Sequence, residues 1–494
     1  MASSLPATKS LILVGGGHAH VHVLKSLRAV CHKQSNNSPV INATLITPSI
    51  YTPYSGMLPG YVSRQYTLSE IHLNLQKLCE FGNVNLILAY AVKIVMDEKT
   101  GNEERGGWVI CSNGQRIKFD VLSINAGISP SLPISAVNKD NVKTEQETTA
   151  MANKIDLITP VKPISTFSSR YEALCDRLHE TRELYNEENP FRLLVVGGGA
   201  GGIELALSAQ YALQRILLGY IDEQGNEVKP NTNTKQTKDV APLKVTIVTK
   251  GSALLTSHNT KVQRILTRIL RKRNVDICYD TEAKDVTLFG DKKPEHELEK
   301  RKSSKSMDVA TAIRLKSLIL TPQSKNQSPI LFHECLWCTS AAAPSWLSTN
   351  TPFDTTNDGF VKVSDTYESV NFKNVFAAGD CCHIVQHPRP KAGVFAVRAG
   401  PLLYTNLLAA LFDKPLHPHK PQSDFLGLIS TGDCYAVASR GRFALEGAYL
   451  WKLKDYIDRK WMDGYVNLHS TYHKENESDR NDVGMGNHTS VIRA

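Results

Sequence analysis

Two glycine-rich loops are the stretches of this chain with the clearest chemical meaning. Each follows an apolar run, residues 11–14 or 193–196, and precedes apolar residues at helical spacing. The order strand, tight turn, helix is typical of a dinucleotide-binding βαβ unit, in which the backbone approaches a pyrophosphate at the helix N-terminus. Each loop contains three fingerprint glycines: Gly15, Gly16 and Gly17 in the first, and Gly197, Gly199 and Gly202 in the second. Two such loops predict two nucleotides bound face to face.

A carboxylate follows a third apolar strand. Residues 374–378 are apolar or small after Asn374, and Gly379 and Asp380 come directly after them. This pattern predicts a strand end that delivers a carboxylate to a ligand. Residues 122–130 and 335–344 both read as a strand ending in a small-residue turn, which favours duplication of one nucleotide-binding architecture.

The cysteines and histidines allow other chemistry. The ten cysteines are scattered, as in a reduced intracellular protein. Two pairs leave a redox role open, Cys335 with Cys338 and Cys381 with Cys382, although a structural role is favoured for both. In the helix after the first loop, His18 and His22 lie on the same face, and His20 lies on another. Packing or phosphate contact is therefore favoured over a metal site for these histidines.

Bulk composition sets the broad class. With 494 residues, 41% hydrophobic residues and 21% charged residues, the chain reads as a globular protein of two or three domains. The net charge of +9 comes without a nucleic-acid-binding signature. No apolar run approaches the roughly 20 residues of a membrane span, and residues 1–10 do not resemble a secretory signal. We therefore expect a cytoplasmic protein, with peripheral membrane or mitochondrial location as the alternatives.

Several motifs carry a resemblance to a known family. They are VGGGHAHVHVLK, YTPYSGMLPGY, NAGISP, VVGGGAGGIELA, FAAGDCCHI, PKAGVFAVRAGP and STGDCYAVASRGRFALEG. Over residues 10–463, apart from two polar insertions, the chain resembles the two-dinucleotide-binding-domain flavoproteins, which include type II NADH dehydrogenases and pyridine nucleotide-disulfide oxidoreductases. The closest resemblance is to the subgroup fused or adjacent to selenide, water dikinase.

The resemblance implies an α/β fold with two Rossmann-like domains (three-layer ββα), one for FAD and one for NAD(P), and a small C-terminal α+β region. The expected divisions are an FAD-binding domain at 9–189 and 351–412, an NAD(P)-binding domain at 190–350, a C-terminal region at 413–468 and a flexible tail at 469–494. The NAD(P)-binding domain would carry disordered insertions near 222–241 and 290–307, which are polar.

The resemblance also assigns cofactor contacts. FAD would be held by Gly15, Gly16, Gly17, His18, Thr47 and Pro48, by Ala126 and Gly127 on the adenosine side, and by Gly379 and Asp380 at the ribityl chain. NADH or NADPH would lie on Gly197, Gly199 and Gly202, with Glu204 near the nicotinamide. Glu204 has an equally weighted alternative role, as an acid in the first turn that favours the helix dipole.

Some positions depart from the family pattern. His20 stands where the first fingerprint has its third glycine, so the helix must pack differently there. Thr47-Pro48 and Thr249-Lys250 replace the acid that bonds a ribose hydroxyl, and Lys250 would tolerate a 2′-phosphate, which leaves NADH and NADPH both open. Residues 48–78 lack the cysteine pair that a disulfide reductase needs.

The expected function is an FAD-dependent NAD(P)H oxidoreductase that passes hydride to flavin and electrons on to a quinone or small-molecule acceptor. Val394 and Arg398 replace the glutamines of type II dehydrogenases near quinone, which weakens the quinone assignment. The alternative is a flavoprotein redox sensor or partner-binding module with slow turnover, linked to selenium metabolism. The basic amphipathic helix at 451–462 would pack on the protein, or else rest on a membrane surface. The sequence leaves the oligomeric state open.

Overall fold

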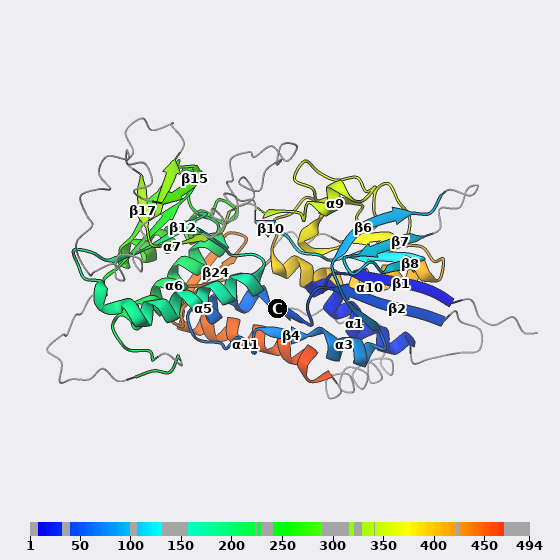
Figure 1. The fold of residues 1–494 in the computed structure, drawn as a ribbon, viewed down its shortest axis with the longest axis horizontal. Coiled ribbons are helices and arrows are strands. Elements are labelled where there is room, and N and C mark those ends of the chain that lie inside the picture. Colours follow the sequence, from blue (N-terminus) through cyan, green and yellow to red (C-terminus); the bar gives the residue numbers. More distant parts are fainter. Residues whose placement is uncertain are drawn as a thin grey trace, which may run out of the picture.

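The computed structural model shows two α/β lobes side by side, with the C-terminal helix passing beneath both (Figure 1). The structure describes residues 8–31, 40–98, 106–130, 157–222, 225–228, 241–288, 316–320, 329–339, 341–420 and 425–468. Most of the two expected insertions and the expected flexible tail lie outside these ranges. The sequence pattern also predicts a helix around residues 144–154, which lies outside them as well. The fold class expected from the sequence is confirmed.

The first lobe, on the right of Figure 1, is built on a parallel sheet of strand order β21-β9-β1-β2-β5. The strands are β1 (Thr8–Val14), β2 (Val40–Thr47), β5 (Asn85–Leu88), β9 (Val121–Ile124) and β21 (Val375–Ala377). β1 is apolar on both faces from Leu11 to Val14 because helices and a second sheet cover the two faces. The chain enters the second lobe and returns for β21, so this sheet joins residues about 250 positions apart.

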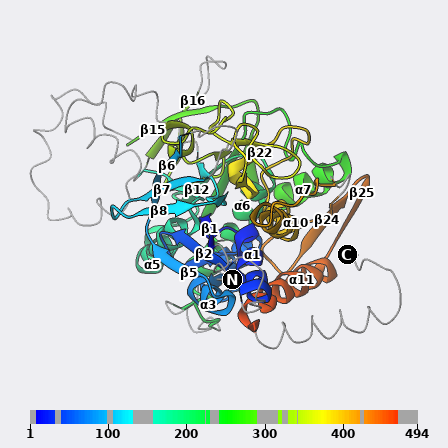
Figure 2. The same cartoon turned by 90° about the vertical axis from the view of Figure 1, so that its right-hand side faces the viewer.

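Helices α1 (His18–Cys31), α3 (Leu75–Gly82) and α10 (Gly393–Leu411) pack together against this sheet, as Figure 2 shows for α1 and α10. The antiparallel strands β6 (Ala91–Met96), β7 (Gly107–Cys111) and β8 (Arg116–Phe119) form a further layer. α10 is the only described helix long and apolar enough to cross a membrane. Its contacts with α1 and β9 place it in the core of this lobe.

The second lobe repeats the plan with the parallel order β11-β18-β12-β13-β14. Its strands are β11 (Thr159–Pro160), β12 (Phe191–Val196), β13 (Leu243–Val248), β14 (Val275–Cys278) and β18 (Glu334–Trp337). Helices α5 (Ile164–Thr181), α6 (Ala200–Leu217) and α7 (Thr260–Lys272) accompany them, and β15 (Ala283–Leu288), β16 (Lys316–Leu320) and β17 (Ile330–Phe332) form a small antiparallel sheet.

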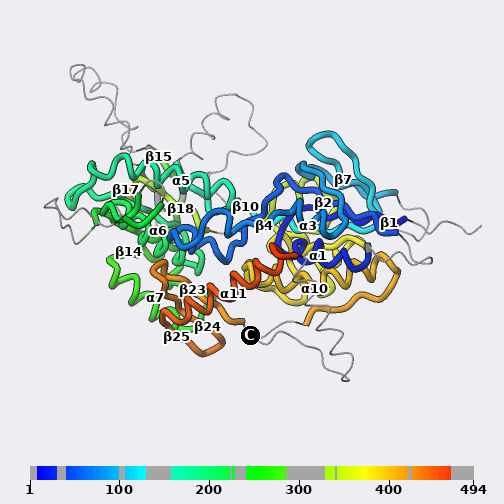
Figure 3. Tube along the Cα trace, turned by 90° about the horizontal axis from the view of Figure 1, so that it is seen from below, coloured from blue at the N-terminus to red at the C-terminus, as the bar shows by residue number. Residues whose placement is uncertain are grey.

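The C-terminal region bridges the two lobes. Strands β23 (Gly427–Ser430), β24 (Ala436–Arg440) and β25 (Phe443–Gly447) lie against α7 of the second lobe. Helix α11 (Ala448–Val466) then runs beneath the first lobe towards α1, as the view from below shows (Figure 3). Near its end, the Tyr465 hydroxyl lies 3.4 Å from His22 Nδ1, and Lys25 Nζ lies 5.6 Å from the centre of the Tyr465 ring. The expected packing of this helix on the protein is therefore present along one of its faces.

Short elements complete the chain. They are β3 (Tyr51–Pro53), η1 (Ser55–Met57), α2 (Leu58–Val62), β4 (His72–Asn74), β10 (Ser129–Pro130), η2 (Arg182–Leu184), β19 (Ala341–Ala342), α9 (Trp346–Thr349), β20 (Val361–Val363), η4 (Gly379–Cys381) and β22 (Cys382–Ile384). The sequence pattern predicts one helix over 68–81, and this prediction is wrong in its first half. Residues 72–74 pair with β3, and the side chain of Asn74 then caps α3 by accepting a hydrogen bond from Lys77 N.

Candidate active site

The first glycine loop is packed tightly against the end of β9. Gly15 has a φ of +90°, and its N–H donates to Ile46 O at 2.8 Å. Gly17 N donates to Asn125 O, and a Cβ on Gly17 would lie 2.0 Å from Asn125 Oδ1. A side chain therefore does not fit at Gly17. At Gly16 the atoms nearest to a Cβ belong to the Leu75 side chain, the closest of them 2.3 Å away.

His20 stands in place of the third fingerprint glycine, and its ring bonds both the glycine loop and β9. Its Nδ1 lies 2.6 Å from Gly15 O, and its Nε2 lies 2.8 Å from Ser123 Oγ. Burial lowers the pKa of His20 to about 4, so the ring is neutral at physiological pH. Nδ1–H therefore donates to the carbonyl oxygen, and Nε2 accepts from the Ser123 hydroxyl. The ring ties the loop to β9 where other fingerprints use close helix packing.

We expect His20→Ala to destabilise the protein by about 3 kcal/mol, because it leaves Gly15 O and the Ser123 hydroxyl unpaired in the core. It should also weaken FAD retention, since the loop loses its tie to β9. Urea unfolding and the flavin content of purified protein measure both effects. His72→Ala is the control, because His72 is only partly buried and lies on short strand β4. Equal unfolding free energies for the two variants would contradict this role.

The residues assigned to FAD gather at the carboxyl ends of β1, β2, β9 and β21, where α/β sheets bind ligands. Thr47 is buried at the end of β2 and donates to Ser49 O at 3.3 Å, and Pro48 is exposed. Ala126 is partly buried directly after β9, and Gly127 has a φ of +72° with open space beside it. Gly379 and Asp380 form the turn after β21.

Asn125 lies between the first glycine loop and the turn at Gly379 and Asp380, and its side chain shows whether this site fits FAD. Its Nδ2 donates to Ala378 O at 2.5 Å, and a Cβ on Gly379 would lie 2.4 Å from that Nδ2. Asn125 Oδ1 is buried and has no hydrogen-bond partner within the described residues. An unpaired acceptor between the glycine loop and Asp380 fits a hydroxyl group of a bound FAD.

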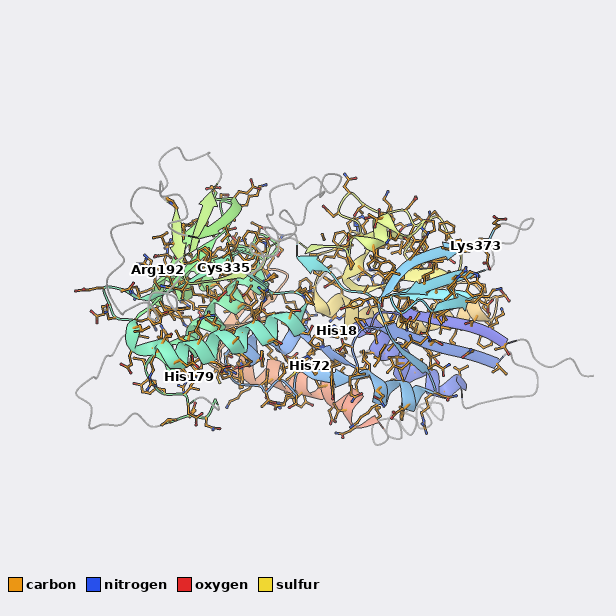
Figure 4. The ribbon with its side chains drawn as sticks, viewed as in Figure 1. His18, His72, His179, Arg192, Cys335 and Lys373 are labelled. Carbon is orange, nitrogen blue, oxygen red and sulfur yellow. The ribbon has the colours of Figure 1, made fainter. Side chains whose placement is uncertain are left out.

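His18, the first residue of α1, lies where the two lobes meet (Figure 4). Its Nε2 lies 3.1 Å from Pro53 O, and its ring makes edge contacts with Tyr54 and Trp461 at 5.4 and 5.5 Å. Burial lowers the pKa of His18 to about 4, so the ring is neutral and Nε2–H donates to the carbonyl oxygen. His18 therefore adds no positive charge for a phosphate.

The second glycine loop has the geometry of an intact fingerprint. Gly197 has a φ of +129°, and a Cβ on Gly202 would lie 2.1 Å from Gly197 O, so the helix packs closely on the strand. No atom of the described residues lies within 4 Å of a Cβ built on Gly199. This open space is where a pyrophosphate would approach the backbone, so the loop fits NADH or NADPH. Lys250, at the end of β13, is paired with Glu282 at 2.8 Å.

Glu204 lies one turn into α6 and faces the C-terminal region. Its Oε1 accepts a hydrogen bond from Ser430 N at 2.8 Å. Burial raises the pKa of Glu204 to about 7, against the opposing charge of Lys454 and the hydrogen bond from Ser430. Glu204 therefore exchanges a proton near neutral pH. A first-turn acid that serves the helix dipole alone would not be held by another part of the chain.

Two charged residues of this site were not identified from the sequence. Lys454 and Asp458 of α11 are 9% and 5% exposed, and Lys454 Nζ lies 2.6 Å from both Asp458 Oδ2 and Gly56 O. The Tyr54 hydroxyl donates to Asp458 Oδ1 at 3.2 Å, and its ring stacks on Trp461. The i, i+4 spacing of Lys454 and Asp458 on an amphipathic helix is a weak signal for such a pair. The Tyr54 ring contacts His18, which follows the first glycine loop, and the charges of Lys454 and Asp458 influence Glu204 after the second loop.

Burial raises the thiol pKa of three of the four paired cysteines. Burial raises the pKa of Cys381 to about 11 and that of Cys382 to about 12. Their thiols donate to backbone carbonyls, Cys381 to Ala378 O and Cys382 to Gly379 O. Cys335 is fully buried within β18, and burial raises the pKa of Cys338 to about 12. A structural role is therefore supported for both pairs.

Comparisons with known proteins agree with this geometry. No curated protein sequence matches the chain significantly. Sulfide:quinone oxidoreductase from Aquifex aeolicus superposes with a TM-score of 0.63 at 15% identity, covering 93% of this chain and 92% of that one. NDH2 from Plasmodium falciparum in complex with NADH gives a TM-score of 0.59 at 13% identity, with 93% and 98% covered. Water-forming NADH oxidase from Lactobacillus brevis bound to NADH gives a TM-score of 0.55 at 15% identity, covering 88% of this chain and 75% of that one.

The sequence profile of the pyridine nucleotide-disulphide oxidoreductases matches residues 9–400. This range includes both glycine loops and the turn at Asp380. The chain therefore belongs to the pyridine nucleotide-disulphide oxidoreductase family, with FAD and NADH or NADPH as its cofactors.

Proposed function

We propose that this chain is an NADH dehydrogenase-like oxidoreductase that uses NADH or NADPH to reduce a quinone or another small-molecule acceptor. When bound, FAD supplies the hydride-accepting chemistry that links the two substrates. The observation that carries the proposal is a set of polar contacts between α11 and the loop at residues 53–57: Lys454 Nζ bonds Asp458 and Gly56 O, and the Tyr54 hydroxyl donates to Asp458. Glu204, which follows the second glycine loop, is influenced by the charges of Lys454 and Asp458, and its pKa of about 7 supports the proton exchange near neutral pH that reduction of a two-electron acceptor requires.

The described cysteines argue against a disulfide or thiol mechanism. Residues 48–78 contain no cysteine, and Tyr54 and Gly56 occupy this loop beside α11. Cys381 and Cys382 remain protonated thiols at neutral pH. An acceptor that takes electrons without forming a bond to sulfur is therefore favoured. Val394 at the start of α10 offers no side-chain hydrogen bond, so a quinone would be held differently from one in a glutamine-lined site.

An exposed apolar surface favours a lipid-soluble acceptor. It consists of Phe443, Leu445, Tyr449, Leu453 and Tyr456, which are 77%, 58%, 57%, 41% and 59% exposed. The residues belong to β25 and α11, which are adjacent in the structure. In the sequence, Arg440 and Arg442 precede this set, Lys452 lies within it and Lys460 follows it. Exposed aromatic residues with surrounding cations favour contact with an anionic membrane surface.

Vesicle binding tests this surface. We expect the protein to cosediment with vesicles that contain anionic phospholipid, and the double variant Phe443→Ser, Tyr449→Ser to lose most of this binding. Tyr90→Ser is the matched control, since Tyr90 is 64% exposed on the first lobe. Unchanged binding of the double variant would remove the membrane from the proposal and favour a soluble acceptor.

The acceptor itself is identified by reoxidation. NAD(P)H-reduced protein is mixed with a lipid-soluble quinone, a water-soluble quinone, a disulfide and selenite under anaerobic conditions. Fast return of flavin absorbance with a quinone supports the proposal, whereas fast return with the disulfide alone would overturn it. Fast return with selenite would instead support the resemblance to the subgroup adjacent to selenide, water dikinase.

The pKa of Glu204 gives a pH prediction. Because folding raises this pKa from 4.5 to about 7, the native state holds a proton that the unfolded chain releases. The associated stability is fully present below pH 4.5 and is lost as the pH rises through about 7. The melting temperature of Glu204→Gln should therefore depend less on pH than that of the wild type over this range. The rate of flavin reduction should likewise lose any inflection near pH 7; identical pH profiles would contradict this assignment.

A further inference from the structure

A lysine from the connection between the lobes reaches the FAD-binding turn. Lys162 follows β11, the edge strand of the second-lobe sheet, whose Pro160 pairs with Trp337 of β18. Its Nζ lies 3.1 Å from Asp380 Oδ2 in the first lobe. The two side chains are 34% and 13% exposed, so the ion pair is accessible from one side. Neither the motifs nor the family resemblance assigns a role to Lys162.

The pair lies at the glycine loop that fits FAD. Asp380 and Lys162 influence the protonation of His18 in opposite senses, which places both charges near the start of α1. Two other cations, Arg389 and Lys391, line a cavity together with Asp380. Arg389 Nη2 donates to the Tyr367 hydroxyl at 2.9 Å, and Lys391 donates to Cys382 O. These two are engaged by other groups, and His18 is neutral, so Lys162 is the cation that pairs with Asp380.

We propose that Lys162 is a cofactor-binding residue whose ammonium group compensates the negative charge of both Asp380 and the FAD pyrophosphate. FAD brings two phosphate charges to a site that already holds a carboxylate. Collecting negative charges in a partly buried site without a cation is costly. Because Lys162 lies two residues after β11 of the second lobe, FAD binding would also fix the segment that connects the lobes. The inference depends on FAD as the cofactor and not on the proposed acceptor.

FAD titration of flavin-depleted protein tests the proposal. Lys162→Gln should weaken FAD binding about tenfold or more, the effect expected for loss of a hydrogen bond to a charged group. Lys162→Arg keeps the charge and should restore most of the affinity. Salt should weaken FAD binding less in Lys162→Gln than in the wild type, because one screened attraction is gone. Lys9→Gln is the control, since Lys9 pairs with Asp413 at 2.8 Å in the same lobe.

A double-mutant cycle with Asp380→Asn separates the proposal from a purely structural ion pair. In the Asp380→Asn background, removing the lysine leaves no carboxylate unpaired. The double variant should therefore be as stable as the single Asp380→Asn variant. A further loss of FAD affinity on adding Lys162→Gln supports direct compensation of the cofactor. Unchanged FAD affinity and salt dependence in this background would overturn the proposal. NAD(P)H and acceptors are absent from the titration, so failure of the proposed function leaves its result unaffected.

Discussion

Gly199→Ala is expected to slow flavin reduction by NADH and NADPH at least about a hundredfold while the protein stays folded and keeps FAD. In the part of the chain that the structure describes, the new Cβ meets no atom within 4 Å, so we expect no cost to folding. It would occupy the space through which the pyrophosphate approaches the backbone at the start of α6. Anaerobic stopped-flow absorbance at the flavin band measures the rate.

Gly201→Ala is the matched control for this variant. Gly201 is exposed, lies two residues further along α6 and also has no atom within 4 Å of a Cβ. Alanine favours a helix over glycine, so this variant should be slightly stabilised and reduced at the wild-type rate. Normal reduction of Gly199→Ala itself would show that the second loop does not hold the nicotinamide nucleotide.

Gly17→Ala is expected to yield protein without bound FAD. The Cβ would lie 2.0 Å from Asn125 Oδ1 and 2.8 Å from Asn125 O, distances that real Cβ atoms do not tolerate, so the loop must move away from β9. This movement removes the geometry that presents the helix N-terminus to the pyrophosphate. The ratio of flavin absorbance to protein absorbance measures the loss. Gly464→Ala in α11 has free space and should stay fully loaded, whereas a loaded Gly17→Ala would place FAD elsewhere.

Local sequence signals identified the elements that hold the cofactors. The sequence pattern predicts helices over residues 260–272 and 393–411, and α7 and α10 have these bounds in the structure. Asn259 supplies a strong local start signal for the first, because its side chain accepts hydrogen bonds from Lys261 N and Val262 N. The apolar runs before both glycine loops became the central strands β1 and β12. Periodicity failed in the first half of the helix predicted over residues 68–81, where residues 72–74 pair with β3 despite an apparent helical face.

The connections within the site could not be predicted, because they join residues far apart in the chain. Tyr54 and Asp458 are separated by 404 positions, and Lys162 and Asp380 by 218. Local pattern carries no information about such pairs. The departure at His20 did indicate unusual packing, but only the structure shows that its ring bridges Gly15 O and Ser123. Glu204 was assigned from the resemblance, and its contact with Ser430 depends on how the C-terminal region folds back.

One measurement tests the central claim most directly: anaerobic mixing of the purified, FAD-loaded protein with NADH and, separately, with NADPH. The account predicts one FAD per chain and rapid loss of flavin absorbance with at least one of the two nucleotides. Protein that binds FAD at this stoichiometry but keeps its full flavin absorbance with both nucleotides would contradict it.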